Sequence, residues 1–479
     1  MIPVLTKEQA YKLDKDTIES GHLSQEELMD NAGKAVAQFF CEKIQNPFSK
    51  NVVVVCGKGN NGGDGVIVHS YLKKYNVPSK IVFTEKNHGH SKLLKKYKIS
   101  KSEFSFYNYK IKFGKYDWII DAIFGIGLSR DLTDKYMKII EKINKNKKII
   151  SIDIPTGAFS DGGSFYHKDK VINSEFTVTF GFSKLGHYLV PINNLFQLDI
   201  GFKPISSNFQ KIGFSDINNI LKFINKKSDI HKYSNGKCFI YGGIKYSGAT
   251  ILSTRACLKT GSSYVNLYYD NSYRMLDKID LLIPEAIITS EILDKKDTKT
   301  PILIGPGDND IDYISIDHID CNDIIVDAGA IEKNRNINHY PSNSILTPHM
   351  GELKKIYGFK DVDYLNLNVL LSLQSIIEEQ IIILKSFNTF IIKKDLIYIM
   401  DRGPSILATS GTGDVLSGIL VSLLSQGYSR LEASIFGTYL HAEAANYYMN
   451  NISKDGMTAS DLIDCIPHAF NELRKNSEL

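Results

Sequence analysis

Short apolar runs alternate with stretches of helical spacing through the first half of the chain. The runs expected to form buried strands are VVVVC (52–56), KIVF (80–83), DWIIDAIFG (117–125), KIISIDIPTG (148–157) and FTVTFG (176–181). One of the intervening helices is expected to begin near Val66. This alternation predicts an α/β fold, in which helices cover both faces of a mostly parallel sheet.

Two more helices are predicted ahead of the first strand, between Thr6 and Lys43. The second should begin near Ser24, because SQEE has the Ser-x-x-Glu spacing of a capping box.

A second α/β series follows a polar stretch between Lys203 and Asn235, where the strand signals fade. Its runs are KCFIYGG (237–243), TPILIGPG (300–307), DIIVDAGA (323–330), SILTPHMGE (344–352), IIILKS (381–386) and TFIIKKD (389–395), before the apolar helix GILVSLLSQGY (418–428). A length of 479 residues leaves room for two cores. We therefore predict two different α/β domains, residues 1–215 and 216–479.

Composition and net charge limit the partners and the cellular compartment that we expect for this protein. A net charge of +4 over 479 residues does not favour a nucleic-acid or membrane-surface partner. The six cysteines have no zinc-site spacing, and we expect them to be reduced and buried. The start of the chain has no secretion signal, and no apolar run reaches about 18 residues. We expect a cytoplasmic protein.

Three strands of the first domain end in glycine-rich loops that carry an acidic residue: CGKGNNGGDG (56–65), DAIFGIG (121–127) and SIDIPTG (151–157). Ligands of doubly wound sheets bind at this edge of the sheet. G-x-G-x-x-G within the first loop is a weak dinucleotide signal by itself, and no Gly-Lys-Ser/Thr follows that would make a P-loop. For Asp64, a purely structural role as a helix cap explains the residue as well as a functional role does.

Asp121 and Asp153 lie at the ends of apolar strands, where a buried carboxylate needs a partner. Oxygen ligands from carboxylate, Asn and Thr side chains can hold a cation, and a carboxylate beside it can move protons.

These three loops, with MDNAG (29–33) ahead of them, resemble the N-terminal epimerase domain of the NAD(P)H-hydrate repair enzymes, a Rossmann-like three-layer fold. The resemblance implies that Asn61, Asp121 and Thr156 ligate K⁺ and that Asp153 is the acid/base. It also implies that the hydrated nucleotide contacts Asp153 together with Asn60, Asn61, Gly62, Gly63, Asp64, Gly125, Ile126, Gly127, Leu128, Ser129, Arg130 and Asp131. Asp30 stands where that family usually has Glu.

In the second domain, ATSGTGD (408–414) precedes an apolar helix expected to begin near Val415. Glycines and hydroxyls at a helix N-terminus form an anion hole suited to a transferring phosphoryl group. Asp414 is placed to accept a proton from the attacking hydroxyl, while a capped helix after a flexible turn is the structural alternative.

The ordered fragments of the second domain resemble the ribokinase-like, nucleotide-dependent NAD(P)H-hydrate dehydratase over residues 231–467, most specifically through TPHMGE (347–352) and GTGD (411–414). The resemblance implies that Asp414 acts on the substrate hydroxyl and that Mg²⁺ accompanies ADP or ATP. It assigns substrate contacts to Ala249, Gly307, His349 and Asp414, and nucleotide contacts to Lys385, Ser386, Phe387, Asn388, Thr389 and Gly413. Asn309, Gly329 and Ser386 depart from the family pattern and put local contacts in question.

The two resemblances together predict a bifunctional isomerase and lyase that epimerises R and S NAD(P)HX and dehydrates the S epimer to NAD(P)H. The alternative is a small-molecule hydroxymethyl kinase with a noncatalytic N-terminal binding or dimerisation module. A homo-oligomer is expected. The sequence does not distinguish ADP from ATP, nor NADHX from NADPHX.

Overall fold

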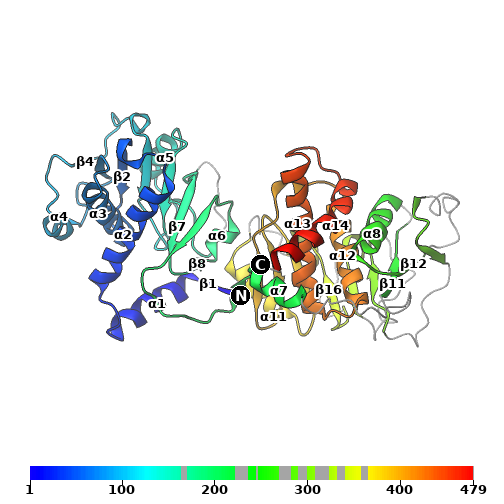
Figure 1. Cartoon of the computed structure of the whole chain (residues 1–479). Coiled ribbons are helices and arrows are strands. Elements are labelled where there is room, and N and C mark those ends of the chain that lie inside the picture. The colour runs from blue at the N-terminus through cyan, green and yellow to red at the C-terminus, as the bar shows by residue number, and fades with distance from the viewer. Residues whose placement is uncertain are drawn as a thin grey trace. The chain divides into compact units, whose positions relative to one another are not determined.

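The computed structural model describes residues 1–162, 170–221, 236–243, 246–268, 282–289, 299–307, 323–331, 340–357 and 365–477. The chain forms two compact units (Figure 1). The N-terminal unit comprises Pro3–Phe209 and Asp363–Val369, and the C-terminal unit comprises Met1–Ile2, Gln210–Val362 and Leu370–Leu479. Strand β10 (Phe209–Lys211) spans the point where the chain passes from one unit to the other.

The N-terminal unit is built on a parallel sheet with the strand order β4-β3-β2-β5-β6-β7-β9. All five predicted strands are present, although three are shorter than the apolar runs. The strand bounds are β2 (Val52–Cys56), β3 (Ser79–Phe83), β4 (Phe104–Phe106), β5 (Trp118–Ala122), β6 (Ile149–Ile152), β7 (Phe176–Phe180) and β9 (Leu195–Leu198). A further parallel pair joins β1 (Ile2–Leu5) to β8 (Ser183–Lys184).

Helices pack on both faces of this sheet, as the alternation predicts. Alternate side chains of β2 point to opposite faces: Val54 packs with α2 (Gln25–Lys43) and α3 (Asn60–Lys74), and Val53 packs with α5 (Asp134–Ile143). Ser24 caps α2 through the predicted capping box. The remaining helices are α1 (Lys7–Glu19), α4 (Ser91–Lys96) and α6 (Gly186–Leu189).

Helix α3 begins at Asn60, six residues before the predicted start at Val66. Its glycines allow this early start, because the chain approaches its neighbours too closely for a side chain. A Cβ at Gly57 would lie 2.0 Å from the Ile123 carbonyl oxygen, and one at Gly62 would lie 2.0 Å from the Gly57 carbonyl oxygen. Gly59 is the N-cap, so Asp64 lies within the helix and is not its cap.

The C-terminal unit has a second, mostly parallel sheet with the order β13-β12-β11-β14-β15-β16-β17 and then antiparallel β18 and β19. All six predicted strands are present among these. Their bounds are β11 (Lys237–Tyr241), β12 (Tyr264–Tyr268), β13 (Ile287–Thr289), β14 (Ile302–Ile304), β15 (Ile324–Val326), β16 (Ser344–Leu346), β17 (Ile381–Lys385), β18 (Thr389–Ile392) and β19 (Ile397–Met400).

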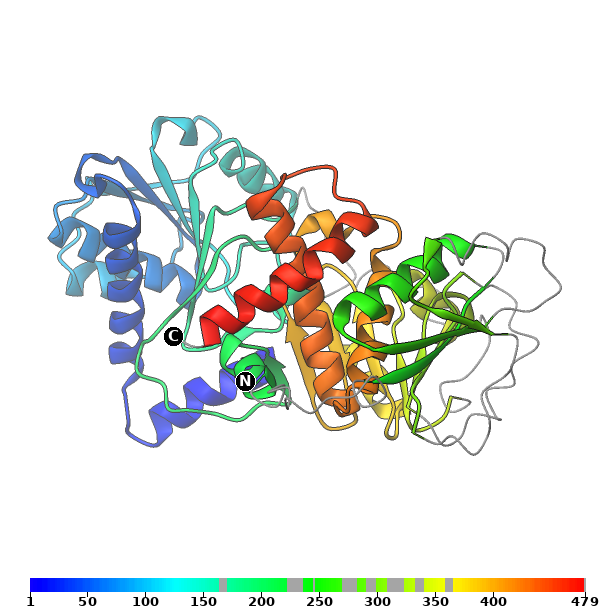
Figure 2. The ribbon, with the colours of Figure 1, turned by 45° about the vertical axis from the view of Figure 1, so that its right-hand side comes forward.

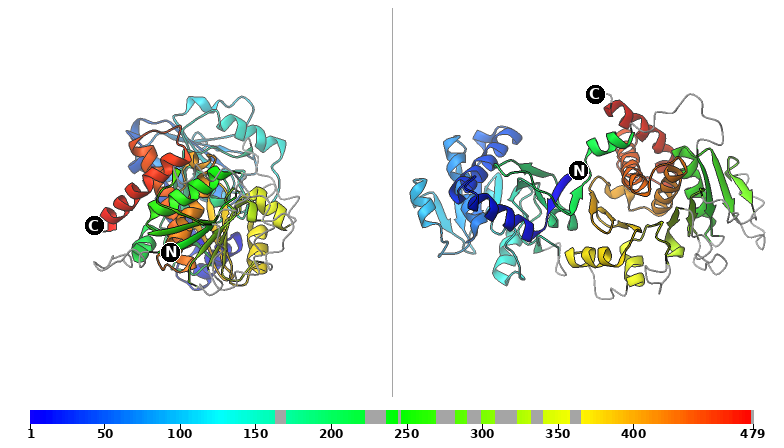
Figure 3. Two further views of the ribbon diagram at one scale, coloured as in Figure 1. Left: turned by 90° about the vertical axis from the view of Figure 1, so that its right-hand side faces the viewer. Right: turned by 90° about the horizontal axis from the view of Figure 1, so that it is seen from below.

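One face of this sheet packs against a layer of five helices, which supplies the main core of the unit (Figures 2 and 3). These helices are α7 (Phe214–Leu221), α8 (Ser247–Thr260), α12 (Thr412–Ser425), α13 (Arg430–Asn451) and α14 (Ala459–Ser477). Two further helices are α10 (Met350–Tyr357) and α11 (Leu367–Ile376). Helix α12 begins at Thr412, three residues before the predicted start, so Asp414 lies in its first turn.

Strand order fixes where ligands can bind in the N-terminal unit. β2 and β5 are neighbours, and the helices that follow them pack on opposite faces of the sheet. The loops after these strands therefore diverge and leave a crevice at the carboxyl edge, which is the usual ligand position in doubly wound sheets. Among the described residues, no helix is both long and apolar enough to cross a membrane.

Candidate active sites

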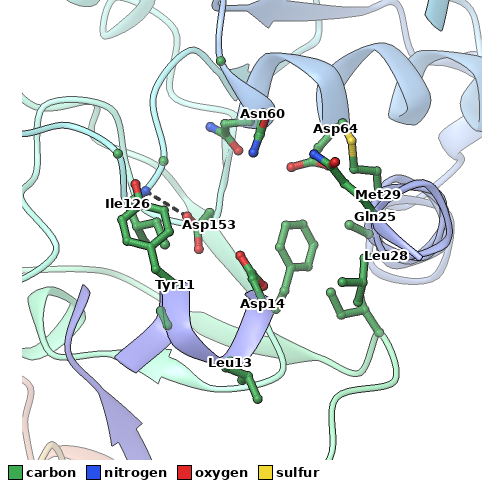
Figure 4. A pocket seen from close by; sticks show the side chains of 18 of the residues that line it. Tyr11, Leu13, Asp14, Gln25, Leu28, Met29, Asn60, Asp64, Ile126 and Asp153 are labelled. Atoms are coloured by element: carbon green, nitrogen blue, oxygen red, sulfur yellow. Dashed lines mark hydrogen bonds between the residues drawn. The ribbon is translucent and has the colours of Figure 1, made fainter. Parts of the chain in front are cut away.

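A pocket of about 820 Å³ opens at this crevice of the N-terminal unit. Its walls come from the loops after β2, β5 and β6 and from helices α1, α2 and α3 (Figure 4). The carboxyl groups of Asp14, Asp64 and Asp153 point into it from three different elements. The three loops singled out in the sequence therefore meet around one cavity.

Asp153 has the most constrained position in the pocket. Its backbone is left-handed, with φ of 67°, a conformation that a non-glycine residue adopts only where its surroundings enforce it. Lys184 Nζ lies 3.0 Å from Asp153 Oδ1 in a buried ion pair, and the Ile126 N–H donates to Oδ2 at 3.0 Å. The Thr179 hydroxyl also donates to Oδ1, at 3.3 Å, so three contacts aim and hold the carboxylate.

Lys184 sets the charge of Asp153. Burial by itself raises the pKa of Asp153, but the charge and hydrogen bond of Lys184 and the Ile126 N–H outweigh burial and lower it below its usual value. The backbone of Asp153 is fixed by His187, whose Nε2 lies 2.7 Å from the Asp153 carbonyl oxygen. Since the Lys184 backbone N–H donates to His187 Nδ1, the His187 proton lies on Nε2 and is donated to Asp153. The lowered pKa means that the Asp153 carboxylate is ionised at neutral pH.

Asp121 is fully buried and has no cationic partner within hydrogen-bonding range in the described chain. Four neutral donors satisfy its oxygens: the Ser151 and Thr156 hydroxyls and the Thr156 and Ile123 backbone N–H groups, at 2.7 to 3.2 Å. Burial raises the pKa of Asp121 to about 6 in spite of these hydrogen bonds. A nearby cation would stabilise its charged form.

The side chain of Asn61 also supports a cation site beside Asp121. Its side-chain oxygen and nitrogen are buried, and neither atom has a hydrogen-bond partner in the described residues. Thr156 Oγ1 accepts from the Phe124 N–H, and a Cβ at the next residue, Gly125, would lie 3.4 Å from Asn61 Cγ. The donor set of Asn61, Asp121 and Thr156 oxygens therefore fits an alkali cation.

The other predicted contacts of the N-terminal unit divide into two groups. Residues that line the pocket are Asn60, Asn61, Asp64, Gly125, Ile126, Gly127, Leu128 and Asp153. Gly62 and Gly63 are buried in the first turn of α3, while Ser129, Arg130 and Asp131 lie on an exposed loop beyond the pocket. Gly125 cannot carry a side chain, because its Cβ would lie 2.7 Å from Asp153 Oδ2.

Sequence reasoning missed Tyr11, Asp14 and Lys184, which all line the pocket. The signal for the first two was their i, i+3 spacing on α1, which places them on one helix face. Lys184 follows the FTVTFG strand and had no pattern of its own. Asp30 was noted only as a departure, and it accepts hydrogen bonds from the Tyr71 and Tyr97 hydroxyls at 2.8 and 2.6 Å.

The catalytic candidates of the C-terminal unit surround the N-terminus of α12. Gly411 is the N-cap, with a left-handed φ of 87°, and Asp414 lies in the first turn. Burial, together with the negative charges of Asp327 and Glu352, raises the pKa of Asp414 to about 7, although the positive charge of Lys385 opposes this rise. A carboxyl group with this pKa can accept and return a proton near neutral pH.

Asp327, at the end of β15, was quoted only as part of a motif, yet it organises this site. Its Oδ1 lies 3.1 Å from Lys385 Nζ and accepts a hydrogen bond from the Thr347 hydroxyl at 2.6 Å. A Cβ at Gly413 would lie 3.4 Å from Lys385 Nζ, so the lysine also reaches the anion hole of α12. The strand ends and the helix N-terminus therefore form one polar cluster.

The remaining predicted residues lie along the same edge of the sheet. His349 pairs with Lys385 in an isolated parallel bridge, and its Nδ1 accepts from the Gly351 and Glu352 N–H groups at the start of α10. Gly307 lies against the loop before Ala249, since its Cβ would be 2.3 Å from the Tyr246 carbonyl oxygen. The turn of the β17–β18 hairpin consists of Ser386, Phe387 and Asn388, and Thr389 is the first residue of β18.

Of the three departures from the family pattern, two can be placed. Gly329 lies in the 3₁₀ turn Ala328–Ala330, whose first residue has a left-handed φ of 46°. Ser386 is exposed in the hairpin turn. Asn309 lies outside the described residues, as does the segment 231–235 at the start of the region 231–467 that resembles the dehydratase.

Family models match both units. Residues 25–186 match the YjeF-related protein N-terminus, and residues 238–468 match the NAD(P)H-hydrate dehydratase model. Relatives named bifunctional NAD(P)H-hydrate repair enzyme Nnr align along nearly the whole chain. The protein from Dictyoglomus turgidum is 29% identical, covering 93% of this chain and 94% of its own length. That from Thermofilum pendens is 27% identical, covering 97% and 96%.

Among solved structures, the ADP/ATP-dependent NAD(P)H-hydrate dehydratase from Bacillus subtilis, co-crystallised with ATP/Mg²⁺, is 23% identical, with a TM-score of 0.48. The match covers 56% of this chain and 100% of that chain. The C-terminal unit, which the dehydratase model matches, and the N-terminal unit, which the YjeF-related model matches, are both α/β domains built on parallel or mostly parallel sheets. Two matched units in this order and relatives that align end to end place the chain in the family of bifunctional NAD(P)H-hydrate repair enzymes.

Proposed function

We propose that the chain repairs hydrated NADH and NADPH in two steps, one in each unit. The N-terminal unit interconverts the R and S epimers of NAD(P)HX, and the C-terminal unit dehydrates the S epimer with ADP or ATP. The observation that carries the proposal is the contrast between two carboxyl groups. Asp153 is an ionised base in the pocket at the crevice, and Asp414 is a base of raised pKa at an anion hole.

In the N-terminal unit, the substrate ring enters the pocket with its hydroxyl towards Asp153. The carboxylate is aimed there by Lys184 and Ile126, and it accepts the hydroxyl proton and later returns it. Asn61, Asp121 and Thr156 hold K⁺, and the bound cation supplies positive charge that offsets the buried Asp121 carboxylate. The remaining predicted loop residues contact the nucleotide.

In the C-terminal unit, Asp414 accepts the proton of the substrate hydroxyl, which then attacks the terminal phosphorus of the nucleotide. The Gly411–Gly413 backbone holds the transferring phosphoryl group at the positive end of α12. The ring nitrogen then expels phosphate, and loss of a proton from the neighbouring ring carbon restores the reduced nicotinamide. Lys385, anchored by Asp327, lies beside the phosphates, and Mg²⁺ accompanies the nucleotide.

The test follows absorbance of the reduced nicotinamide while the full chain acts on a mixture of both NADHX epimers with ADP or ATP, Mg²⁺ and K⁺. Complete recovery of NADH is expected, and the effective nucleotide identifies the phosphoryl donor. Recovery that stops near half, after correction for spontaneous epimerisation, would contradict the N-terminal assignment. A stable phosphorylated product would contradict the dehydratase assignment.

A further inference from the structure

Helix α1 contributes polar side chains to the epimerase pocket although it precedes the region that matches the family model, which begins at residue 25. Tyr11 and Asp14 are three residues apart on α1 and therefore share a helix face. Figure 4 shows both side chains directed into the cavity, with the Asp14 carboxyl group between those of Asp64 and Asp153. None of the contacts described above assigns a role to either residue.

The charged groups around Asp14 come from α1, from α3 and the loop before it, from the loop after β6 and from β8. Lys184 on β8 and Asp153 after β6 act on it most strongly among them, and Asp14 in turn acts on Asp64 of α3 and on Tyr11 of its own helix. The other charged side chains that line the cavity are Lys15, Glu19 and Lys58. The residues that α2 places there are uncharged, namely Gln25, Leu28, Met29 and Ala32.

The surroundings of Asp14 and Asp153 shift the pKa values of the two carboxyl groups in opposite directions. Burial raises the pKa of Asp14 to about 6; Lys184 opposes the rise and Asp153 adds to it. Asp153 has the opposite shift, because its direct contact with Lys184 lowers its pKa. Two carboxyl groups whose surroundings drive their pKa values apart are the usual basis of an acid and base pair.

Asn61 shows independently that this cavity is shaped for a polar ligand. The residue is only 7% exposed, and both polar atoms of its side chain are buried without a hydrogen-bond partner in the described chain. It lines the same pocket as Asp14. A buried amide without partners costs folding free energy. K⁺ would satisfy the Asn61 oxygen, and a ligand group in the cavity is expected to satisfy its nitrogen.

We propose that Asp14 is a second catalytic residue of the epimerase pocket and acts as the general acid that works with the Asp153 base. The proposal rests on the epimerase function proposed above for the N-terminal unit. It assigns proton transfer to a helix that composition and motif analysis left without a function.

The step balances without any further reactant. The Asp153 carboxylate accepts the hydroxyl proton, the carbon–oxygen bond becomes a carbonyl, and the ring carbon–nitrogen bond breaks with its electron pair going to nitrogen. The Asp14 carboxyl group donates a proton to that nitrogen. Rotation of the freed aldehyde exposes its other face; nitrogen then attacks it, Asp14 takes back the nitrogen proton, and Asp153 returns a proton to oxygen.

The experiment measures conversion of pure R-NADHX to the S epimer by chromatography, with the full chain, K⁺ and no nucleotide, so that dehydration does not occur. Asp14→Asn is compared with wild type and with Asp16→Asn, which removes the same charge from an exposed position of α1 that does not line the pocket. Asp14→Glu tests whether a carboxyl group restores activity. S-NADHX dehydration with nucleotide is measured in parallel.

Asp14→Asn should lower the kcat for epimerisation by about 100-fold, the lower range for loss of a general acid. Asp16→Asn should leave it unchanged, and Asp14→Glu should recover part of it. Wild-type activity should fall as the pH rises above about 6, where Asp14 loses its proton, and Asp14→Asn should lack this limb of the profile. S-epimer dehydration should be unchanged in all variants.

Thermal unfolding separates catalysis from folding. A carboxyl group whose pKa is raised on folding stabilises the fold below its unfolded value and loses that contribution as the pH rises through about 6. Asp14→Asn should therefore be at least as stable as wild type at pH 7.5. Epimerisation within threefold of wild type, or an unchanged alkaline limb, would overturn the proposal. If wild type itself does not convert the R epimer, the proposed epimerase function fails instead.

Discussion

Each unit contains a buried aspartate and a lysine near its reaction centre, but the lysine has a different partner in each. In the N-terminal unit Lys184 contacts the candidate base Asp153 at 3.0 Å, and the pKa of that base is lowered. In the C-terminal unit Lys385 contacts Asp327 at 3.1 Å, and the pKa of the candidate base Asp414 is raised to about 7. Residue types alone do not determine acidity; the direct ion-pair partner does.

The difference suits the two reactions. An epimerase returns the proton that it takes, so a base kept ionised beside a separate acid can work in either direction. A phosphoryl acceptor must be deprotonated once as it attacks, and a base with a pKa near the working pH does this efficiently. Strained backbone also differs in its place. The base Asp153 itself is left-handed in one unit, while Ala328, the residue after Asp327, is left-handed in the other.

The largest effects should come from replacing each of the two candidate bases in turn. Asp153→Asn should lower R-epimer conversion by about 1000-fold and leave S-epimer dehydration intact, while Asp414→Asn should do the reverse. Chromatography of the epimers and absorbance of the reduced nicotinamide measure the two activities. Loss of both activities in either variant would show that the two units do not act separately.

Removing Lys184 should make the surroundings of Asp153 resemble those of Asp414. In Lys184→Met the pKa of Asp153 should rise, so the acid limb of the epimerisation profile should move to higher pH. Loss of one partner from a buried ion pair should also destabilise the N-terminal unit by about 3 kcal/mol, measured by denaturant unfolding near pH 7. An unmoved acid limb would contradict the role given to Lys184.

Asp327→Asn should lower the pKa of Asp414, which is opposite to the rise expected for Asp153 in Lys184→Met. Wild-type dehydration should increase as the pH rises through about 7, because Asp414 must be ionised to accept a proton. The variant removes a negative charge that raises the pKa of Asp414 and frees Lys385 to contact it. Its rate profile should therefore have a lower midpoint. A higher midpoint, measured from rates between pH 5.5 and 9, would contradict this account.

The N-cap glycines of α3 and α12 should respond differently to alanine. Gly411→Ala should destabilise the C-terminal unit by about 2 kcal/mol, because φ is 87° and the Cβ would lie 2.7 Å from Leu252 Cδ1. Gly59 has φ of −84° and no atom within 4 Å of its Cβ, so Gly59→Ala should cost less than about 1 kcal/mol. Calorimetric unfolding of the two variants checks the order, and equal losses would contradict it.

Potassium should stabilise only the N-terminal unit, and by a small amount. At about ten times its dissociation constant, K⁺ should add about 1.4 kcal/mol relative to choline at the same ionic strength. Asn61→Ala should abolish the difference, because it removes a side-chain oxygen that we assign to the cation. Thermal unfolding in KCl and in choline chloride provides the measurement. A K⁺ effect that persists in Asn61→Ala would place the cation elsewhere.

The order of strands and helices could be predicted from the sequence because it depends on local patterns. Apolar runs of β-branched residues correctly indicated the parallel strands, and SQEE correctly indicated the start of α2. Helix starts were less accurate. α3 and α12 both begin earlier than expected, because glycines that suggest a loop are tolerated in a first turn where the chain packs closely.

The sequence indicated candidate site residues only where a motif follows a strand or begins a helix. GNNGGDG, DAIFGIG and SIDIPTG could be found because strand ends meet at one edge of a parallel sheet, and GTGD could be found because it precedes an apolar helix. Tertiary structure alone decided that Lys184 pairs with Asp153, that Lys385 pairs with Asp327, and that Asp14 of α1 enters the pocket. Partners far apart in the chain leave no local pattern, and burial and charge, which set their pKa values, arise only when the chain has folded.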